Sequence, residues 1–253
     1  MSKFNHVLIT GASSGIGEAL AIYYAKHGTK LLSICGRNEE RLNKTADECR
    51  KFGAEVNTKI IDVADAKAME TWIDEVNLKM PLNLVFANAG VATLEETSEN
   101  VRRTFNINVM GVVNTVLPAI ELFKKAPADQ KKHIAITSSI AGYHGMPTCP
   151  SYSATKAGVK AWGEGLRLAL APLGINVSII CPGFIRSRIT DKNTCPMPYF
   201  MEADKAAEII AKRIEKNVGL IAFPWQMRLA TWLGSILPNV VSDFIYSKLP
   251  YKV

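Results

Sequence analysis

The chain has 253 residues, 48% of them hydrophobic, and a formal net charge of +7 at pH 7. Its five cysteines form no C-x-x-C pair and its four histidines show no ligand spacing, so we expect neither a disulfide framework nor a metal site. The basic residues form no single stripe, which argues against nucleic-acid binding. We expect a cytoplasmic protein, peripheral to a membrane at most, because we find neither a signal peptide nor an uncharged stretch long enough to span a bilayer.

Short apolar runs alternate with helical patterns along the chain, which is typical of βαβ units. The expected strands are 4–9, 30–35, 55–61, 83–87, 132–138 and 175–181. The longest expected helices are 99–125, which contains a potentially kinking Pro118, and 150–172. No repeat or interdomain linker is visible. We therefore predict a single α/β domain over residues 1–253, with a doubly wound parallel sheet and helices on both faces.

The first strand runs directly into a glycine-rich turn. Val7-Leu8-Ile9 is followed by Thr10-Gly11-Ala12-Ser13-Ser14-Gly15-Ile16-Gly17 and then by a helical run. Strand, glycine turn and helix are the context of a dinucleotide site. The glycines let the backbone approach a pyrophosphate, and the helix N-terminus favours its negative charge.

The second strand ends in Gly36-Arg37. Sites for NAD place a carboxylate near this position, whereas NADP sites use an arginine for the 2′-phosphate. A cation at a helix N-terminus is unfavourable with the helix dipole, so a phosphate partner explains Arg37 well. Alternatively, Arg37 is a solvated side chain that pairs with Glu39 or Glu40. We predict NADP(H).

Tyr152 and Lys156 are four residues apart, which places them on one face of the expected helix. A free tyrosine, with a pKa of about 10, is a poor proton donor or acceptor at neutral pH. An ammonium beside it favours the phenolate and moves its pKa towards the working range. Ser139 is suited to hold a substrate oxygen nearby. The spacing alone is a weak signal, but together with the glycine turn it predicts proton transfer in a carbonyl/alcohol interconversion.

With both motifs in place, the chain resembles the short-chain dehydrogenases/reductases over roughly residues 4–190. The matching positions are Thr10, Gly11, Gly15 and Gly17 of T-G-x-x-x-G-x-G, Asp62-Val63 on the adenine side, Asn88-Ala89-Gly90 at a strand end, Asn108 in Asn108-Val109-Met110-Gly111, and the nicotinamide turn Pro182-Gly183 with Ile185 and Ser187 beyond it. Ala87 and Ser187 depart from the family pattern, which usually has asparagine and threonine there.

The resemblance implies a single-domain Rossmann fold and a role for each catalytic residue. Tyr152 would be the general acid/base and Ser139 would orient the carbonyl oxygen. Lys156 would bind the ribose hydroxyls while tuning Tyr152, and Asn108 would hold a water in a proton relay. Because the long helices often pair between subunits in this family, the resemblance also implies a homodimer or homotetramer.

Residues 184–204 are expected to form the substrate loop. Its Cys195–Phe200 part is apolar and contains two prolines, which suits an apolar substrate; a structural loop packed on the core is an equal alternative. Arg186 and Arg188 either meet an anionic group or face water. The residues His144, Met146 and Cys149 are candidates for the pocket wall.

The C-terminal segment 220–253 is expected to be apolar and helical. Leu229, Trp232, Leu233, Ile236 and Leu237 fall at i, i+3, i+4, i+7 and i+8. Pro238 should end that helix before a second short one that contains Val240, Val241, Phe244, Ile245 and Leu249. One interpretation is packing on the domain or on a sister subunit. The other is a pocket wall that also rests on an anionic membrane surface.

Together these features predict an NADPH-dependent oxidoreductase that interconverts a ketone and a secondary alcohol, with reduction as the favoured direction. An apolar or lipid-like carbonyl is the leading substrate class. A thioester-linked 3-oxoacyl chain, a steroid-like ketone and a sugar derivative remain open. The alternative of another class is a non-catalytic NADP(H)-binding sensor or scaffold, although such a protein has no need of Ser139 and Tyr152.

Overall fold

The computed structural model describes residues 3–93, 95–193 and 196–246, and it contains one seven-stranded parallel sheet with the strand order β3-β2-β1-β4-β5-β6-β7. The strands are β1 (His6–Thr10), β2 (Leu31–Gly36), β3 (Glu55–Ile60), β4 (Leu84–Ala87), β5 (Lys132–Thr137), β6 (Ile175–Pro182) and β7 (Leu220–Phe223). The order reverses on either side of β1, so the sheet is doubly wound, as predicted. The polypeptide is a single-domain Rossmann fold.

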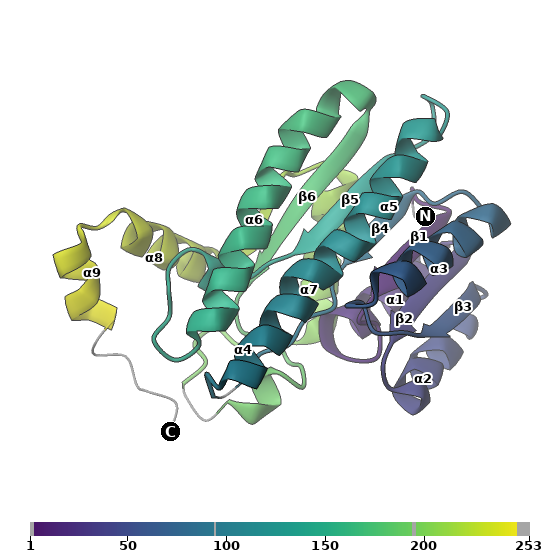
Figure 1. Cartoon of the computed structure of the whole chain (residues 1–253). Coiled ribbons are helices and arrows are strands. Elements are labelled where there is room, and N and C mark those ends of the chain that lie inside the picture. The colour runs from purple at the N-terminus through teal and green to yellow at the C-terminus, as the bar shows by residue number, and fades with distance from the viewer. Residues whose placement is uncertain (1–2, 94, 194–195, 247–253) are drawn as a thin grey trace.

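Helices cover both faces of this sheet (Figure 1). They are α1 (Gly15–Lys26), α2 (Glu39–Arg50), α3 (Ala66–Lys79), α4 (Ser98–Phe105), α5 (Gly111–Lys125), α6 (Pro150–Leu170), α7 (Ala203–Glu215), α8 (Trp225–Ile236) and α9 (Asn239–Tyr246). Helices α8 and α9, drawn in yellow, extend away from the sheet beyond the end of α6.

The hydrophobic core has two layers, one on each face of the sheet, because buried side chains alternate between the two faces along each strand. On β4, Phe86 joins the buried cluster that contains residues of α1, α2 and α7, whereas Val85 joins the cluster of α3, α5 and α6. Residues on β5 divide in the same way, with Ala135 on the first face and Ile134 on the second. Successive side chains of a strand point to opposite faces, so continuous apolar strands are buried on both sides.

The six predicted strands are confirmed to within two residues at each end, but the prediction missed β7. Residues 220–223 are therefore a strand and not the start of the C-terminal helical segment. A four-residue apolar run carries no usable periodicity, and only pairing with β6 makes it a strand. The two helices expected after it are confirmed as α8 and α9. Leu249 lies outside the described residues.

The predicted helix 99–125 consists of α4, a π-helical turn at Asn106–Met110 and α5, which contains Pro118. By length and composition alone, Ser98–Lys125 could span a membrane, and 44% of its apolar 18-residue stretch is buried inside the domain. Val112, Val116 and Phe123 belong to the core cluster under the sheet. We therefore interpret this run as a core helix.

Two glycines of α6 offer a matched test of this packing. A Cβ on Gly163 would lie 2.8 Å from Cγ1 of Ile179 on β6, whereas a Cβ on Gly165 would meet nothing within 4 Å. We expect Gly165→Ala to raise the free energy of unfolding by about 1 kcal/mol through helix propensity. Gly163→Ala should lower it, because overpacking a core costs about 1–3 kcal/mol. Urea denaturation of both variants checks this; equal effects would contradict the packing.

Candidate active site

Hydrogen bonds tie together the carboxyl ends of three neighbouring strands. The Thr10 hydroxyl at the end of β1 accepts from the backbone N–H groups of Asn88 (3.0 Å) and Ala89 (3.1 Å) after β4. The Asn88 amide donates to the Thr10 carbonyl (3.1 Å) and accepts from the Thr137 hydroxyl on β5 (3.2 Å). In a doubly wound sheet, ligands bind in the crevice outside the carboxyl ends of the strands.

The glycine turn after β1 forms a backbone cradle. Gly11 and Gly15 have φ of +69° and +59°, values that L side chains rarely adopt. A Cβ on Gly11 would lie 2.8 Å from Cα of Ala89, and one on Gly17 would collide with the Gly11 carbonyl oxygen. Ser14 is the N-cap of α1, and its side chain makes no capping hydrogen bond. The turn therefore leaves the N-terminus of α1 open to an anion.

Helix α6 carries Tyr152 and Lys156 into the same crevice. Nζ of Lys156 lies 5.7 Å from the centroid of the Tyr152 ring and donates to the Thr137 carbonyl (2.9 Å). The hydroxyl of Ser138 donates to the Lys156 carbonyl (2.7 Å), so the end of β5 and the helix are joined. Ser139 follows as the N-cap of a short 3-10 helix, Ile140–Gly142. Three of the four predicted catalytic side chains, those of Ser139, Tyr152 and Lys156, line one cleft.

Asn108 lies behind this cleft in the π-helical turn, fully buried. Its side chain accepts from the N–H of Val91 (2.8 Å) and donates to the Val91 carbonyl (2.9 Å) and to Thr155 (3.2 Å). A Cβ on Gly90 would be 3.3 Å from both Oδ1 of Asn108 and Nζ of Lys156. Both polar groups therefore lie against the backbone at Gly90. π-helical turns are frequent at functional sites.

Glu96 supports the start of α6, and the sequence prediction missed it. One carboxylate oxygen accepts from both the backbone N–H (3.1 Å) and the hydroxyl (2.8 Å) of Ser151. A carboxylate is favourable at a helix N-terminus, so Glu96 fixes the turn that presents Tyr152. Because the two residues are 55 positions apart in the chain, no local pattern could have revealed this contact.

At the other end of the crevice, Arg37 follows β2. One of its guanidinium nitrogens lies 3.6 Å from the Asp62 carboxylate, so its partner is Asp62 and not Glu39 or Glu40 as in the alternative interpretation. Arg41, which the prediction also missed, lines the same crevice, and its buried Nε has no hydrogen-bond partner. The sequence could have indicated Arg41, because it lies in the first turn of α2, four residues after Arg37.

A single cleft of about 650 Å³ joins the two ends. The predicted cofactor residues that line it are Gly11, Ser13, Ser14, Gly15, Ile16, Arg37, Asp62, Val63, Asn88, Ala89, Gly90, Tyr152, Lys156, Pro182, Gly183, Ile185 and Ser187. Of the other predicted residues, Thr10, Gly17 and Asn108 support the cleft from behind. No group of three or more His, Cys, Asp or Glu among the described residues has a geometry suited to a metal ion.

The substrate loop reaches the cleft through its first residues. Arg188 lines the cleft, whereas Arg186 pairs with Glu202 (2.7 Å) and lies over the Phe200 ring. Arg186 is thus engaged within its own loop. His144, Met146 and Cys149 are not among the described residues that line the cleft, and Cys195 lies outside the described part of the chain.

A family profile described as short chain dehydrogenase matches residues 5–196. The chain belongs to this family. It is 32% identical to 11-beta-hydroxysteroid dehydrogenase-like 4A of Arabidopsis thaliana, over 93% of this chain and 81% of that protein. A similar solved structure is a short-chain dehydrogenase from Sphingobium yanoikuyae in complex with NADPH, with a TM-score of 0.79 and 24% identity over 97% of this chain and 96% of that one. Another is a short chain dehydrogenase/reductase from Burkholderia phymatum in complex with NAD, with a TM-score of 0.79 and 25% identity over 95% of each chain.

Membership makes this protein an oxidoreductase that acts on CH–OH groups of small molecules with a nicotinamide cofactor. Short-chain dehydrogenases also form oligomers. The cleft fits such a cofactor, because it combines a glycine cradle at a helix N-terminus with two arginines at the far end.

In this short-chain dehydrogenase, burial is the largest cause of the pKa shifts of Tyr152 and Lys156. It raises the pKa of Tyr152 to about 12, while a hydrogen bond with Ser139 acts in the opposite direction. The sequence prediction that the pKa of Tyr152 moves towards the working range is therefore wrong, because the pKa lies above its ordinary value of 10. The reason is that removing the phenol from water outweighs an ammonium 5.7 Å from the ring. Tyr152 therefore keeps its proton at neutral pH.

The same burial lowers the pKa of Lys156 to about 8, because it disfavours the charged form. Lys156 is therefore positively charged below about pH 8 and becomes neutral as the pH rises further.

We expect kcat/KM for carbonyl reduction to be constant near pH 6–7 and to fall as the pH rises through about 8, as Lys156 loses its charge. Initial rates of cofactor oxidation between pH 6 and 10 measure this. In Lys156→Arg the guanidinium stays charged, so any remaining activity should lose this descending limb. A wild-type profile that stays flat to pH 10 would contradict the assignment.

Proposed function

We propose that this protein is an NADPH-dependent reductase that converts an apolar or lipid-like ketone into a secondary alcohol, with Tyr152 as the general acid. One observation carries the proposal. Ser139, Tyr152 and Lys156 line the same cleft as Arg37 and Arg41, with the glycine cradle between the two groups. A protein that only held a nucleotide would need the arginines and the cradle but not the serine and the tyrosine.

The nicotinamide, when bound, supplies a hydride to the carbonyl carbon. The Ser139 hydroxyl donates a hydrogen bond to the carbonyl oxygen and so orients it. As negative charge develops on that oxygen, Tyr152 transfers its phenolic proton to it. One hydride and one proton convert the ketone into the alcohol, and the reverse reaction uses the phenolate as the base.

After that transfer Tyr152 is a partly buried phenolate, which needs stabilisation and a new proton. The Lys156 ammonium is the nearby positive charge, and we assign it a second role in binding the ribose hydroxyls. Asn108 is held by Val91 and Thr155, and the second lone pair of its Oδ1 is suited to a relay water next to Lys156.

Two arginines and the absence of a carboxylate at Gly36 favour NADPH over NADH. The buried, unpartnered Nε of Arg41 supports this choice, since a phosphate would satisfy it. The NADPH-bound structure from Sphingobium yanoikuyae shows that a similar fold accepts this cofactor, although the Burkholderia phymatum structure contains NAD.

The substrate class and the molecular setting are also part of this proposal. The hydroxysteroid dehydrogenase-like relative supports an apolar ketone, and Ile185 and Ile189 contribute apolar side chains to the lining of the cleft. We infer a homodimer or homotetramer in the cytoplasm, with subunits joined through α4, α5 and α6.

Tyr152→Phe should retain NADPH binding and lose roughly 10²–10⁴-fold in kcat, as expected for a positioned general acid. Lys156→Ala should weaken both cofactor binding and turnover. Fluorescence titration with NADPH and steady-state rates with a panel of ketones measure the two quantities separately. Turnover in Tyr152→Phe equal to the wild type would remove this mechanism, and binding without turnover in the wild type would favour a sensor.

Arg37→Ala and Arg41→Ala should each weaken NADPH binding by roughly 10- to 150-fold, because a hydrogen bond to a charged group is worth about 1.5–3 kcal/mol. Binding of NADH should hardly change. Arg50→Ala is the matched control, since Arg50 is an exposed arginine at the other end of α2 that pairs with Asp47. Equal affinity of the wild type for NADPH and NADH would contradict the assignment.

A further inference from the structure

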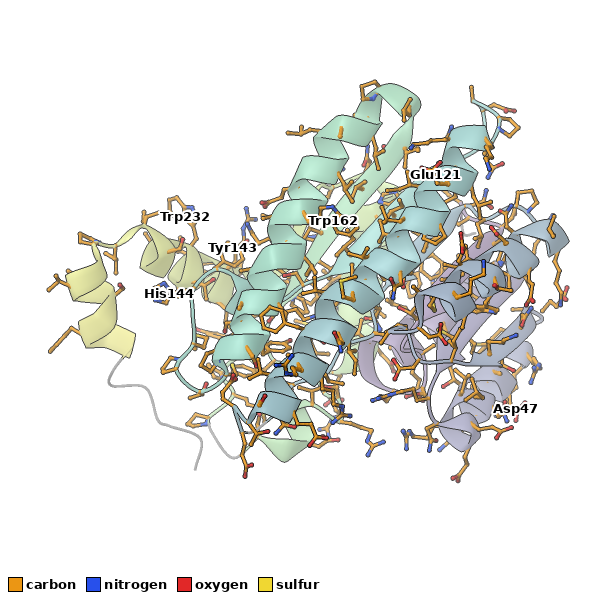
Figure 2. The ribbon with its side chains drawn as sticks, in the orientation of Figure 1. Asp47, Glu121, Tyr143, His144, Trp162 and Trp232 are labelled. Carbon is orange, nitrogen blue, oxygen red and sulfur yellow. The ribbon has the colours of Figure 1, made fainter. Side chains whose placement is uncertain are left out.

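The apolar stripe of α8 faces outward. Its members Leu229, Trp232 and Ile236 are 46%, 49% and 60% exposed, Trp225 one turn before Leu229 is 69% exposed, and α8 contains no buried residue. Figure 2 shows Trp232 projecting from α8 away from the sheet. The α8–α9 surface consists of these side chains together with Leu233, Val240, Val241 and Phe244, all of them exposed. A contiguous apolar surface of this kind marks an interaction site.

The opposite side of α8 adjoins the active site. A Cβ on Gly183, in the turn that lines the cleft, would lie 2.9 Å from Sδ of Met227 and 3.5 Å from Cδ1 of Ile140. Ile140 directly follows the catalytic Ser139. The N–H of Gly183 donates to the Phe223 carbonyl (2.8 Å) just before α8 begins. One helix therefore separates the exposed apolar surface from the catalytic end of the cleft.

The composition of this surface suits a bilayer of anionic lipids. Two of the four tryptophans in the sequence lie on α8, and tryptophan prefers the level of the lipid headgroups. Helix α8 carries Arg228 and no acidic residue. From Pro224 to Val253 the sequence contains Arg228, Lys248 and Lys252 against one acid, Asp243. Buried apolar area and basic charge act together in binding to anionic membranes.

We propose that the α8–α9 surface docks on an anionic bilayer, so that an apolar ketone passes from the lipid into the cleft without crossing water. Docking itself is independent of catalysis. The delivery of substrate rests on the proposed function, since it requires an apolar ketone as the substrate. The inner side of α8, with Met227 against the Gly183 turn, then forms the wall between the lipid and the catalytic residues.

Binding of the full-length protein to phosphatidylglycerol vesicles at low salt tests the docking. We expect co-sedimentation and a blue shift of tryptophan emission, and much weaker effects with phosphatidylcholine. Trp232→Ser combined with Ile236→Ser should reduce the affinity at least about tenfold. Leu78→Ser combined with Phe52→Ser is the matched control, since these side chains are 86% and 46% exposed and lie outside both this surface and the proposed subunit interface; this variant should bind like the wild type.

Rates with two ketones separate docking from catalysis. Phosphatidylglycerol vesicles should raise kcat/KM for 2-dodecanone and leave that for cyclohexanone unchanged; no increase would overturn the delivery. Turnover without vesicle binding by the folded protein would overturn the docking and leave the proposed function standing. Vesicle binding without turnover of any ketone would overturn the proposed function and leave the docking standing. If Trp232→Ser/Ile236→Ser instead dissociates an oligomer in sedimentation velocity, a second copy covers this surface and the proposal fails.

Discussion

The hydrogen bonds among Thr10, Asn88 and Thr137 are the constraint on which the rest of the structure depends. They fix the carboxyl ends of β1, β4 and β5 relative to one another, and Lys156 extends the connection by donating to Thr137. The cradle for a cofactor and the helix that carries the catalytic side chains are thereby joined through the sheet edge. Of the residues in these hydrogen bonds, only Lys156 has a proposed catalytic role. The other bonds hold the strand ends that position Lys156 and the cofactor cradle.

The sequence predicted the placement of those residues whose spacing is local. The glycine turn, and Tyr152 with Lys156, depend on one turn or one helix, so their relative positions follow from backbone geometry. Glu96 and strand β7 depend on contacts across the fold and left no local pattern. The C-terminal stripe is an intermediate case. Helical periodicity identified the residues that share a face of α8, but not that this face points away from the domain.

Burial shifts the pKa values of the two ionisable side chains at the Tyr152 end of the cleft. It favours the neutral forms of both Tyr152 and Lys156. In the mechanism that we propose, the phenol therefore gives up its proton only as negative charge develops on the substrate oxygen. The arginines at the opposite end of the cleft are partly exposed, which suits an ionic group that arrives from water.

The π-helical turn between α4 and α5 has a consequence for how this chain tolerates changes in length. A π-helical turn accommodates an extra residue relative to an α-helical one, and here that extra residue sets the rotation of Asn108 towards Val91 and Thr155. Deleting a single residue within Asn106–Met110 would leave a regular α-helix between α4 and α5 and remove the local widening in which Asn108 faces Val91 and Thr155. The number of residues between α4 and α5 is therefore fixed, although the three segments follow one another as one continuous helix.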